Sequence, residues 1–219
     1  MDAVPSFAGL TLAEFEQRLA SVKPVPGGGS ASAIAGSIAA SLLAMVARLS
    51  LDRPKYAAYE GTCMRALDTA ESARPRLLSL ADEDARAYGA FAAARKMPRG
   101  TEAEQRARDA ASQAAAREAS EIPAAVVREC ARVIYEVEAV SGRSNLNAAS
   151  DLEVAARLAA AAAHGAAANV MINLPMVGDE PFGAALTAEV DGLLEDIDRA
   201  AAAVMERVRA GSLREPEPE

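Results

Sequence analysis

The stretch Pro24-Val25-Pro26-Gly27-Gly28-Gly29-Ser30, followed by the charge-free run 31–47, decides how this chain folds. The two prolines stiffen the approach and disfavour helix before the glycines. Three successive glycines let the backbone adopt positive φ and come close to another surface. Ser30 stands where a helix N-cap is expected, and the run after it keeps its large apolar residues at helical spacing. The stretch therefore predicts a tight turn that opens a buried helix over about residues 30–50.

Such a turn leaves N–H groups at the positive end of a helix dipole, which suits an anionic or strongly polar ligand. Core packing does not require three glycines in a row, so we interpret the turn as part of a binding site. A flexible Gly/Ser connector is the alternative, but the stiff prolines before it and the immediate helix after it count against that. A nucleotide P-loop is excluded, because Gly-Lys-Ser/Thr is absent and no buried strand precedes the glycines.

The composition favours helix throughout the chain. Apolar residues make up 51 % of the 219 residues, aromatics only 4 %, and alanine is abundant while β-branched residues are few. No segment alternates with the period of a strand. We therefore expect a single-domain, all-α bundle of long helices with short loops over residues 11–210. Residues 1–10 are expected to be an N-terminal extension, and the acidic, proline-containing residues 211–219 a disordered tail.

Start and stop signals divide the bundle into helices. Capping boxes at Thr11, Thr101 and Ser150 predict three helix starts. Pro75 and Pro123 predict a kink or break in the two longest helices, near 56–96 and 101–141. Two later helices carry apolar residues at spacings of four and three, which can serve either the core or a partner subunit. These residues are Val126, Cys130, Val133, Val137 and Val140, and Val190, Leu194, Ile197, Ala201, Val204 and Val208.

Charge and cysteine usage restrict the partners and the compartment. The net charge of −8 argues against nucleic acid, which requires a basic surface. The uncharged runs 31–47 and 158–174 are rich in small residues and lack aromatic belts, so we expect core helices rather than membrane spans. Cys63 and Cys130 form no CxxC pair and are expected to be buried thiols. The first ten residues show no export signal, so we expect a cytoplasmic protein.

Several segments together resemble one family. The turn at 24–30 is similar to the P-x-PGGGS start of the cyclodeaminase/cyclohydrolase family, which includes the C-terminal domain of formiminotransferase-cyclodeaminase and stand-alone methenyltetrahydrofolate cyclohydrolases. Other matching segments follow in the same order between Thr11 and Val208. They are Met45–Ser50 (M-V-A-N-L-T), Asp82–Tyr88 (D-x-D-x-x-A-F), Gln113, Ile122-Pro123, Asn145–Asp151 (N-x-N-x-x-S-D) and Ala167–Leu174 (A-L-N-V-x-I-N-L).

The chain departs from the family pattern after its second helix. The family's G-K-K-K-Y is Asp52-Arg53-Pro54-Lys55-Tyr56 here, so that only Lys55 and Tyr56 match and Arg53 is a substitute cation. Ser144 and Glu153 stand where the family has glycines. These changes concern turnover and substrate choice more than the fold.

The resemblance implies a tetrahydrofolate substrate and a homodimer, with no cofactor beyond the substrate and no metal. It implies either hydrolysis of 5,10-methenyltetrahydrofolate to 10-formyltetrahydrofolate or cyclising deamination of 5-formiminotetrahydrofolate. The stand-alone hydrolase is favoured, because the chain has no room for a formiminotransferase domain. A folate binder that has lost turnover and a purely structural helical dimer are the alternatives.

The candidate catalytic residues are Lys55, Asp84, Gln113 and Asp151. A carboxylate at Asp84 or Asp151 can bind the guanidine-like edge of a pterin through paired hydrogen bonds, although Asp151 can equally complement a helix dipole. The segment 82–84 can instead be a solvated helix face. Lys55 can donate a proton or orient water if burial lowers its pKa, and Gln113 can orient substrate, but both residue types are commonly plain surface.

The candidate substrate-binding residues share polar side chains or close backbone approach. Asn169 and Asn173 lie one turn apart in an apolar stretch, so they share a face and are expected to hydrogen-bond a ligand or a neighbouring element. Asp84 and Tyr88 are likewise one turn apart. We assign His164 to packing or the surface. The full candidate set is Pro26, Gly27, Gly28, Gly29, Ser30, Arg53, Tyr56, Tyr88, Asn145, Asn147, Asn169 and Asn173.

Overall fold

The computed structural model describes residues 6–217, and within this range every regular element is a helix. The all-α expectation is confirmed. The long helices are α2 (Gly28–Ser50), α3 (Glu60–Ala94), α4 (Glu102–Val140), α5 (Ala149–Asn173) and α6 (Glu180–Ala210). The shorter ones are η1 (Phe7–Gly9), α1 (Leu12–Leu19), η2 (Pro54–Tyr59), η3 (Leu146–Ala148) and η4 (Leu174–Met176).

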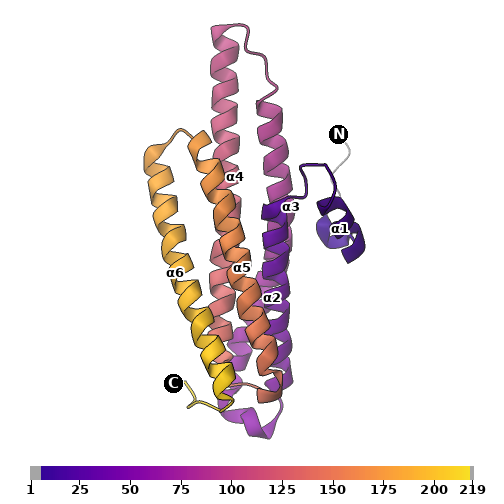
Figure 1. Cartoon of the computed structure of the whole chain (residues 1–219), viewed down its shortest axis with the longest axis vertical. Helices are drawn as coiled ribbons and strands as arrows, with labels where there is room; N and C mark the ends of the chain where they lie inside the picture. Colours follow the sequence, from indigo (N-terminus) through magenta and orange to yellow (C-terminus); the bar gives the residue numbers. More distant parts are fainter. Residues whose placement is uncertain (1–5, 218–219) are drawn as a thin grey trace.

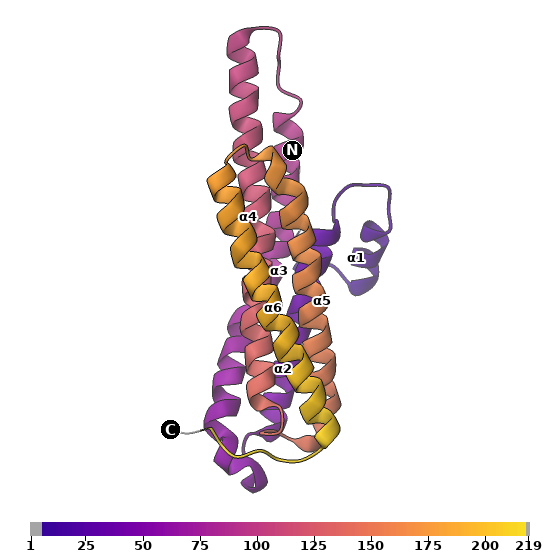
Figure 2. The same cartoon turned by 60° about the vertical axis from the view of Figure 1, so that its left-hand side comes forward.

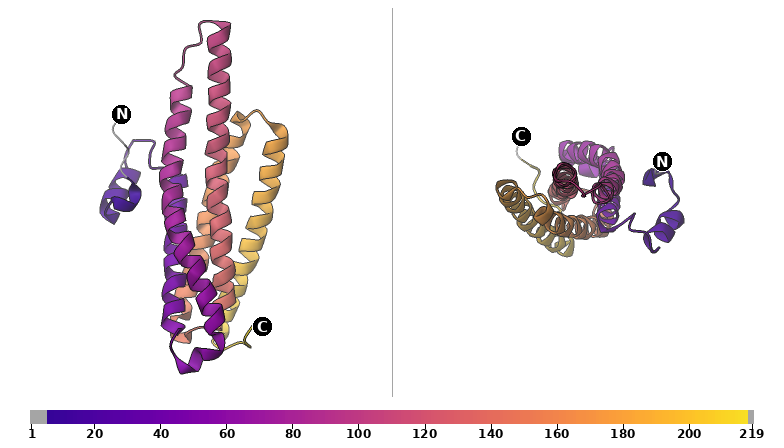
Figure 3. Two further views of the ribbon diagram at one scale, coloured as in Figure 1. Left: turned by 180° about the vertical axis from the view of Figure 1, so that it is seen from behind. Right: turned by 90° about the horizontal axis from the view of Figure 1, so that it is seen from above.

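Four helices form the bundle (Figure 1). α2 packs against α3 and α5, and α4 packs against the same two helices. α6 lies on the outside against α4 and α5, as Figure 2 shows. The α3–α4 hairpin extends beyond the ends of α5 and α6 as a two-helix arm, and α1 stands to one side of the bundle (Figure 3).

The seams with four-three spacing pack inside the bundle. Val126, Cys130, Val133, Val137 and Val140 are all buried, as are Val190, Ile197 and Val204. Gly36 allows α2 to approach its neighbours closely, because a Cβ there would lie 2.9 Å from the Cys130 sulfur. Both cysteines are free and buried, and burial raises the pKa of Cys130 to about 12.

The large side chains of α2 contradict the expectation of a helix buried all round. Its core-facing residues are mostly small, with Leu43 and Val46 as the large ones, whereas its other large apolar residues lie on the outer side of the bundle. Ile38, Met45 and Leu49 are exposed, and Ile34 and Leu42 are half-buried. α2 is long and apolar enough to cross a membrane by length and composition, and 56 % of its most apolar window is buried in the bundle. We call Ile34, Ile38, Leu42, Met45 and Leu49 the outward stripe of α2.

Several helix boundaries differ from the sequence-based expectation. α2 begins at Gly28 with Gly27 as N-cap, so Ser30 is not the cap. The capping boxes at Thr11 and Thr101 are confirmed, but the one expected at Ser150 is wrong, because α5 begins at Ala149 without a side-chain cap. Pro75 and Pro123 do not interrupt α3 or α4. Both lie more than a turn inside continuous helices, where packing against neighbouring helices outweighs the one lost hydrogen bond.

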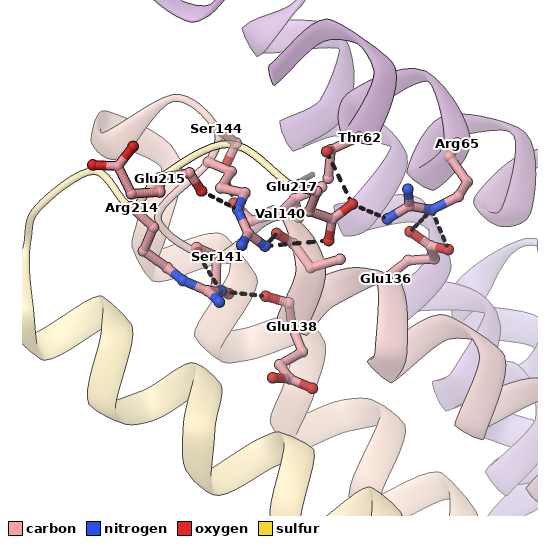
Figure 4. Close-up of polar contacts among 12 residues, drawn as sticks. Thr62, Arg65, Glu136, Glu138, Val140, Ser141, Ser144, Arg214, Glu215 and Glu217 are labelled. Atoms are coloured by element: carbon pink, nitrogen blue, oxygen red, sulfur yellow. Dashed lines mark hydrogen bonds and ion pairs between the residues drawn. The ribbon is translucent and has the colours of Figure 1, made fainter. Parts of the chain in front are cut away.

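The C-terminal segment also differs from expectation. Residues 212–217 run back over the end of the bundle and make specific contacts there, instead of being disordered (Figure 4). The Tyr59 hydroxyl donates to the Arg214 carbonyl oxygen at 2.7 Å, and Glu217 pairs with Arg65 and Arg143. Leu213 packs on a small apolar cluster of Tyr56, Tyr59 and Cys63. Residues 218–219, the rest of the expected tail, lie outside the described residues.

The N-terminal extension docks on α3. The backbone N–H of Phe7 and the hydroxyl of Ser6 both donate to the Asp82 carboxylate, at 2.8 and 2.6 Å. The rings of Phe7 and Phe15 pack edge to face. Asp82 is therefore occupied by the N-terminal segment. Residues 1–5 of the expected extension lie outside the described residues.

Candidate active site

The glycine turn forms one wall of a cavity of about 270 Å³. Gly27 to Gly29 lie against α3 on one side and the end of α5 on the other. We call this cavity the glycine-turn pocket. It is lined by Pro24, Val25, Gly27, Gly28, Gly29, Asp84, Tyr88, Phe91, Ala119, Asn169, Ile172 and Asn173.

Asp84 is the ionisable group that the turn holds most closely. Its carboxylate accepts from the backbone N–H of Ser30, and the Ser30 hydroxyl lies 2.8 Å from its Oδ2. The carboxylate therefore caps the N-terminus of α2 from a neighbouring helix. Of the anionic or strongly polar ligand expected at this end, an anion is disfavoured, since Asp84 already occupies the helix N-terminus.

Gly29 makes that approach possible. A Cβ at Gly29 would lie 2.2 Å from Asp84 Oδ1, far inside van der Waals contact. At Gly28 the nearest atom would be Asn169 Nδ2 at 3.5 Å, an ordinary contact. Of the three glycines, Gly29 is therefore the one that a larger residue could least replace, because the Asp84 carboxylate of α3 lies against it.

Partial burial affects the pKa of Asp84. Desolvation raises the pKa of its carboxyl above the ordinary value, and the two hydrogen bonds from Ser30 oppose this in part. A raised pKa makes a carboxyl a better proton acceptor than an ordinary aspartate, and the protonated form can return the proton. Asp84 is therefore suited to general acid–base work inside the pocket.

Two amides face the same cavity from α5. Asn169 Nδ2 donates to the Gly165 carbonyl oxygen at 2.8 Å, and Asn173 Nδ2 donates to the Ala119 carbonyl oxygen at 2.7 Å. These bonds fix both side chains. Within residues 6–217 neither amide oxygen accepts a hydrogen bond, so each pocket-lining amide retains an acceptor for a ligand's N–H group.

The remaining candidates divide into two groups. Gln113 lines an adjoining groove on the α3–α4 arm, and Ser30 and Pro26 are buried and do not line the pocket. The others lie near the C-terminal end of α2, which is about 33 Å from the glycine turn at its N-terminal end. We call them the far-end cluster: Arg53, Lys55, Tyr56, Asn145, Asn147 and Asp151.

Within the far-end cluster, Asn145 has a structural role. It is buried, its backbone N–H donates to the Ser50 hydroxyl at 2.8 Å, and its side chain accepts from Asn147 N–H and the Tyr56 hydroxyl. Lys55 is exposed and Asp151 is half-buried at the start of α5. Asp151 and Asn169 are eighteen residues apart on one helix, or about 27 Å, so one protomer does not bring them together. His164 is exposed and contacts Asp198, in agreement with a surface role.

Comparison with known proteins identifies the family. The model of the family described as formiminotransferase-cyclodeaminase matches residues 11–192. The chain belongs to this family. A methenyltetrahydrofolate cyclohydrolase of Methylorubrum extorquens is 36 % identical over 90 % of this chain and 93 % of its own length. A formimidoyltransferase-cyclodeaminase of Sus scrofa is 32 % identical over 91 % of this chain, which spans only 37 % of that relative.

A solved structure supports the fold of this folate one-carbon family. The formiminotetrahydrofolate cyclodeaminase of Thermotoga maritima superposes with a TM-score of 0.84 at 30 % identity, covering 93 % of this chain and 98 % of that one. The relatives therefore include both a cyclohydrolase and a cyclodeaminase of about this length.

An apolar face connects the two groups of candidate residues. The outward stripe of α2 lies beside a stripe of small and apolar residues on α5 at spacings of three and four. At its ends this stripe reaches Asp151 in the far-end cluster and Ile172, 70 % exposed, at the rim of the glycine-turn pocket. The stripe on α5 consists of Val154, Leu158, Ala161, Gly165, Ala168 and Ile172.

Sequence reasoning missed several pocket residues. Phe91, Ala119 and Ile172 line the cavity but carry no polar group that marks them. Phe91 could have been found from its spacing, since Asp84, Tyr88 and Phe91 lie four and three residues apart on one face of α3. Ile172 and Ala119 depend on how α4 and α5 pack, which sequence spacing does not give.

Proposed function

We propose that this protein is a methenyltetrahydrofolate cyclohydrolase whose pterin binds in the glycine-turn pocket. The observation that carries the proposal is the half-buried Asp84, with its raised pKa, facing a cavity lined by two amide acceptors. The full-length match to a cyclohydrolase of similar size favours hydrolysis. The second candidate reaction is cyclodeamination, which the similarity to the stand-alone Thermotoga enzyme favours.

In this proposal the amides orient the substrate. The 2-amino and N3–H groups of a pterin are donors, and the oxygens of Asn169 and Asn173 are the complementary acceptors. The methenyl group carries a positive charge shared between N5 and N10. The carboxylate of Asp84 stabilises that charge in a partly desolvated site.

Asp84 then moves the protons. A water molecule attacks the methenyl carbon, forming a C–O bond, while Asp84 accepts one of its protons. The bond from that carbon to N5 breaks as Asp84 returns the proton to N5, and the hydroxyl proton is released as the formyl carbonyl forms on N10. The balance is methenyl cation plus water giving 10-formyltetrahydrofolate plus one proton. A carboxyl with a pKa raised by burial is suited to both transfers.

We further propose that the active unit is a two-fold dimer built on the α2–α5 apolar face. A two-fold axis through the middle of α2 places the far-end cluster of one copy at the glycine-turn pocket of the other. Lys55, Tyr56 and Asp151 of a second copy would then complete the site. This explains why family-matching residues occur at both ends of the apolar face and why large apolar side chains cover the area between them.

The direct test is turnover. We expect purified protein to accelerate the loss of methenyltetrahydrofolate absorbance above the spontaneous rate, with little ammonia release from 5-formiminotetrahydrofolate. The Asp84→Asn variant should lose about 100-fold or more in kcat, as expected when a general acid–base is removed. Asp82→Asn is the matched control, because Asp82 is on the same helix but contacts Ser6 and Phe7. Equal activity of both variants, or ammonia release as the faster reaction, would contradict the proposal.

The composite site has its own test. Asp84→Asn and Asp151→Asn copies are each expected to be nearly inactive. Refolded together in equal amounts, half of the dimers carry one intact site of two, so activity should return to about one quarter of wild type. No recovery on mixing would contradict a site shared between copies.

A further inference from the structure

The chain after α6 crosses one end of the bundle. Gly211 is the C-cap of α6, in the left-handed conformation with φ 63°, and residues 212–217 then run back over that end (Figure 4). We call residues 212–217 the C-terminal strap. The strap follows residue 192, the last residue that the family model matches, so the match assigns it no role.

The strap contacts a first segment, residues 54–65, which comprises η2 and the first turns of α3. The Tyr59 hydroxyl donates to the Arg214 carbonyl oxygen at 2.7 Å. Leu213 packs on the apolar cluster of Tyr56, Tyr59 and Cys63, whose members are all buried. One hydrogen bond and one apolar contact therefore fix the strap on this segment.

The strap also contacts a second segment, residues 141–151, which comprises the loop after α4 and the start of α5. The Arg214 N–H donates to the Gly142 carbonyl oxygen at 2.7 Å. Arg143 Nε donates to the Glu215 carbonyl oxygen, also at 2.7 Å. Gly142 has φ 74°, and a Cβ there would lie 2.9 Å from both Cγ and Cδ of Arg214. The loop and the strap therefore fit closely, and glycine at position 142 allows it.

Glu217 joins the two segments through one carboxylate. It pairs with Arg65 of the first segment at 2.9 Å and with Arg143 of the second at 3.2 Å (Figure 4). The Arg143 side chain is only 12 % exposed, so solvent screens this pair less than a fully exposed one. Within residues 6–217, the direct hydrogen bonds between the two segments are 3.4 Å or longer. The strap thus supplies the shorter polar links between them.

These two segments carry most of the far-end cluster. Lys55 and Tyr56 are in η2, and the Lys55 ammonium lies over the Tyr56 ring, 5.4 Å from its centre. Asn145, Asn147 and Asp151 are in the second segment. The placement of one set relative to the other therefore depends on the contacts of the strap.

We infer that the C-terminal strap holds Lys55 and Tyr56 in place relative to Asp151, and that turnover depends on it. The inference rests on the proposed function, because there the far-end cluster of one copy completes the glycine-turn pocket of another. The strap of one copy then serves the reaction in its partner. Leu213 and Glu217 are positioning residues, which act through the cluster and do not touch the substrate.

The test variant is Leu213→Ala/Glu217→Gln, which weakens the apolar contact of the strap and both of its ion pairs. We expect kcat to fall by about tenfold with unchanged helix content, because small displacements of groups at a reacting centre are costly. The matched control is Leu193→Ala/Glu189→Gln. It also changes a half-buried leucine and an ion-paired glutamate, but both are in the middle part of α6. The control should keep the wild-type kcat.

Mixed dimers distinguish positioning from a general loss of stability. A dimer of the strap variant with Asp84→Asn combines the intact pocket of the first copy with the intact far-end cluster of the second. Half of the dimers are mixed after refolding in equal amounts, so activity should reach about one quarter of wild type. With Asp151→Asn as the partner, every intact pocket meets an impaired cluster, and activity should stay near about one twentieth.

Tyr59→Phe is a milder second variant, because it removes only the hydroxyl that donates to the strap. It should lower kcat by about threefold and recover only with Asp84→Asn. A wild-type kcat in the strap variant, or activity with Asp151→Asn equal to or above that with Asp84→Asn, would overturn the inference and leave the cyclohydrolase proposal intact. Absence of turnover by the wild-type protein would instead contradict the proposed function.

Discussion

Replacing Gly29 with alanine tests how the turn and Asp84 depend on each other. The added Cβ would lie 2.2 Å from Asp84 Oδ1 and 2.8 Å from Oδ2, so the carboxyl must leave its position at the N-terminus of α2. That movement breaks its hydrogen bonds with Ser30. The Ser30 hydroxyl can still donate to the Ala81 carbonyl oxygen, but the buried Ser30 N–H is left without a partner, at a cost of about 1–3 kcal/mol. Alanine itself favours the helix by up to about 1 kcal/mol. We therefore expect Gly29→Ala to lower the free energy of unfolding by about 1–2 kcal/mol.

The effect of Gly29→Ala on the free energy of unfolding should change sign when the Asp84 carboxyl is removed. In an Asp84→Ala background the clash is gone, and the helix preference of alanine should make Gly29→Ala stabilising by about 0.5–1 kcal/mol. Gly28→Ala should be stabilising in both backgrounds, because its Cβ makes only an ordinary contact at 3.5 Å. Urea unfolding followed by circular dichroism measures all of these variants. Equal destabilisation by Gly29→Ala in both backgrounds would refute the reasoning.

Three further predictions follow from other contacts. Because burial raises the pKa of Asp84, its neutral form stabilises the fold; this contribution is complete below its ordinary pKa of 3.8 and is lost as pH rises through the folded-state value. Wild-type stability minus that of Asp84→Asn, measured by urea unfolding, should therefore fall as pH rises above about 4, and a constant difference would count against the raised pKa. Glu217→Gln weakens the ion pairs with Arg65 and Arg143 and should lower the free energy of unfolding by about 1 kcal/mol. The control Glu153→Gln affects one pair, with Arg157 in the same helix, and should lower it by less than about 0.5 kcal/mol. Equal losses in thermal unfolding would show that the contacts of the C-terminal segment do not stabilise the fold. Ile38→Glu places a charge on the exposed apolar face of α2 and not in the core. Sedimentation should therefore show monomers, while circular dichroism shows unchanged helix content. A dimer of unchanged stability would exclude this face as the interface.

Local signals in the sequence predicted most of the fold. The capping boxes at Thr11 and Thr101 and the seam from Val126 to Val140 gave correct helices, because capping and core packing depend on near neighbours along the chain. Of the kink or break expected at Pro75 and Pro123, the break is wrong, since α3 and α4 are continuous through both prolines. The expectation that α2 is a buried helix was only partly right, because Ile38, Met45 and Leu49 are exposed on its outer side. Its small residues face the core because neighbouring helices approach closely there, which spacing alone does not reveal.

The candidate site was predictable in its residues but not in its arrangement. Gly29, Asp84, Asn169 and Asn173 meet at one cavity, as expected from the motifs. Asp151 and the rest of the far-end cluster do not join them, because one rigid helix separates Asp151 from Asn169. The role of Asp84 as the partner of the α2 N-terminus depends on the packing of α2 on α3, and no local pattern encodes it.

The position of the pterin ring tests the account most directly. A crystal structure of the protein with a stable analogue of 10-formyltetrahydrofolate should show the ring in the glycine-turn pocket. Its 2-amino and N3–H groups should face the oxygens of Asn169 and Asn173, with the reacting carbon within hydrogen-bonding reach of Asp84 through one water. A pterin bound without contact to Asp84 or to either amide would contradict the account.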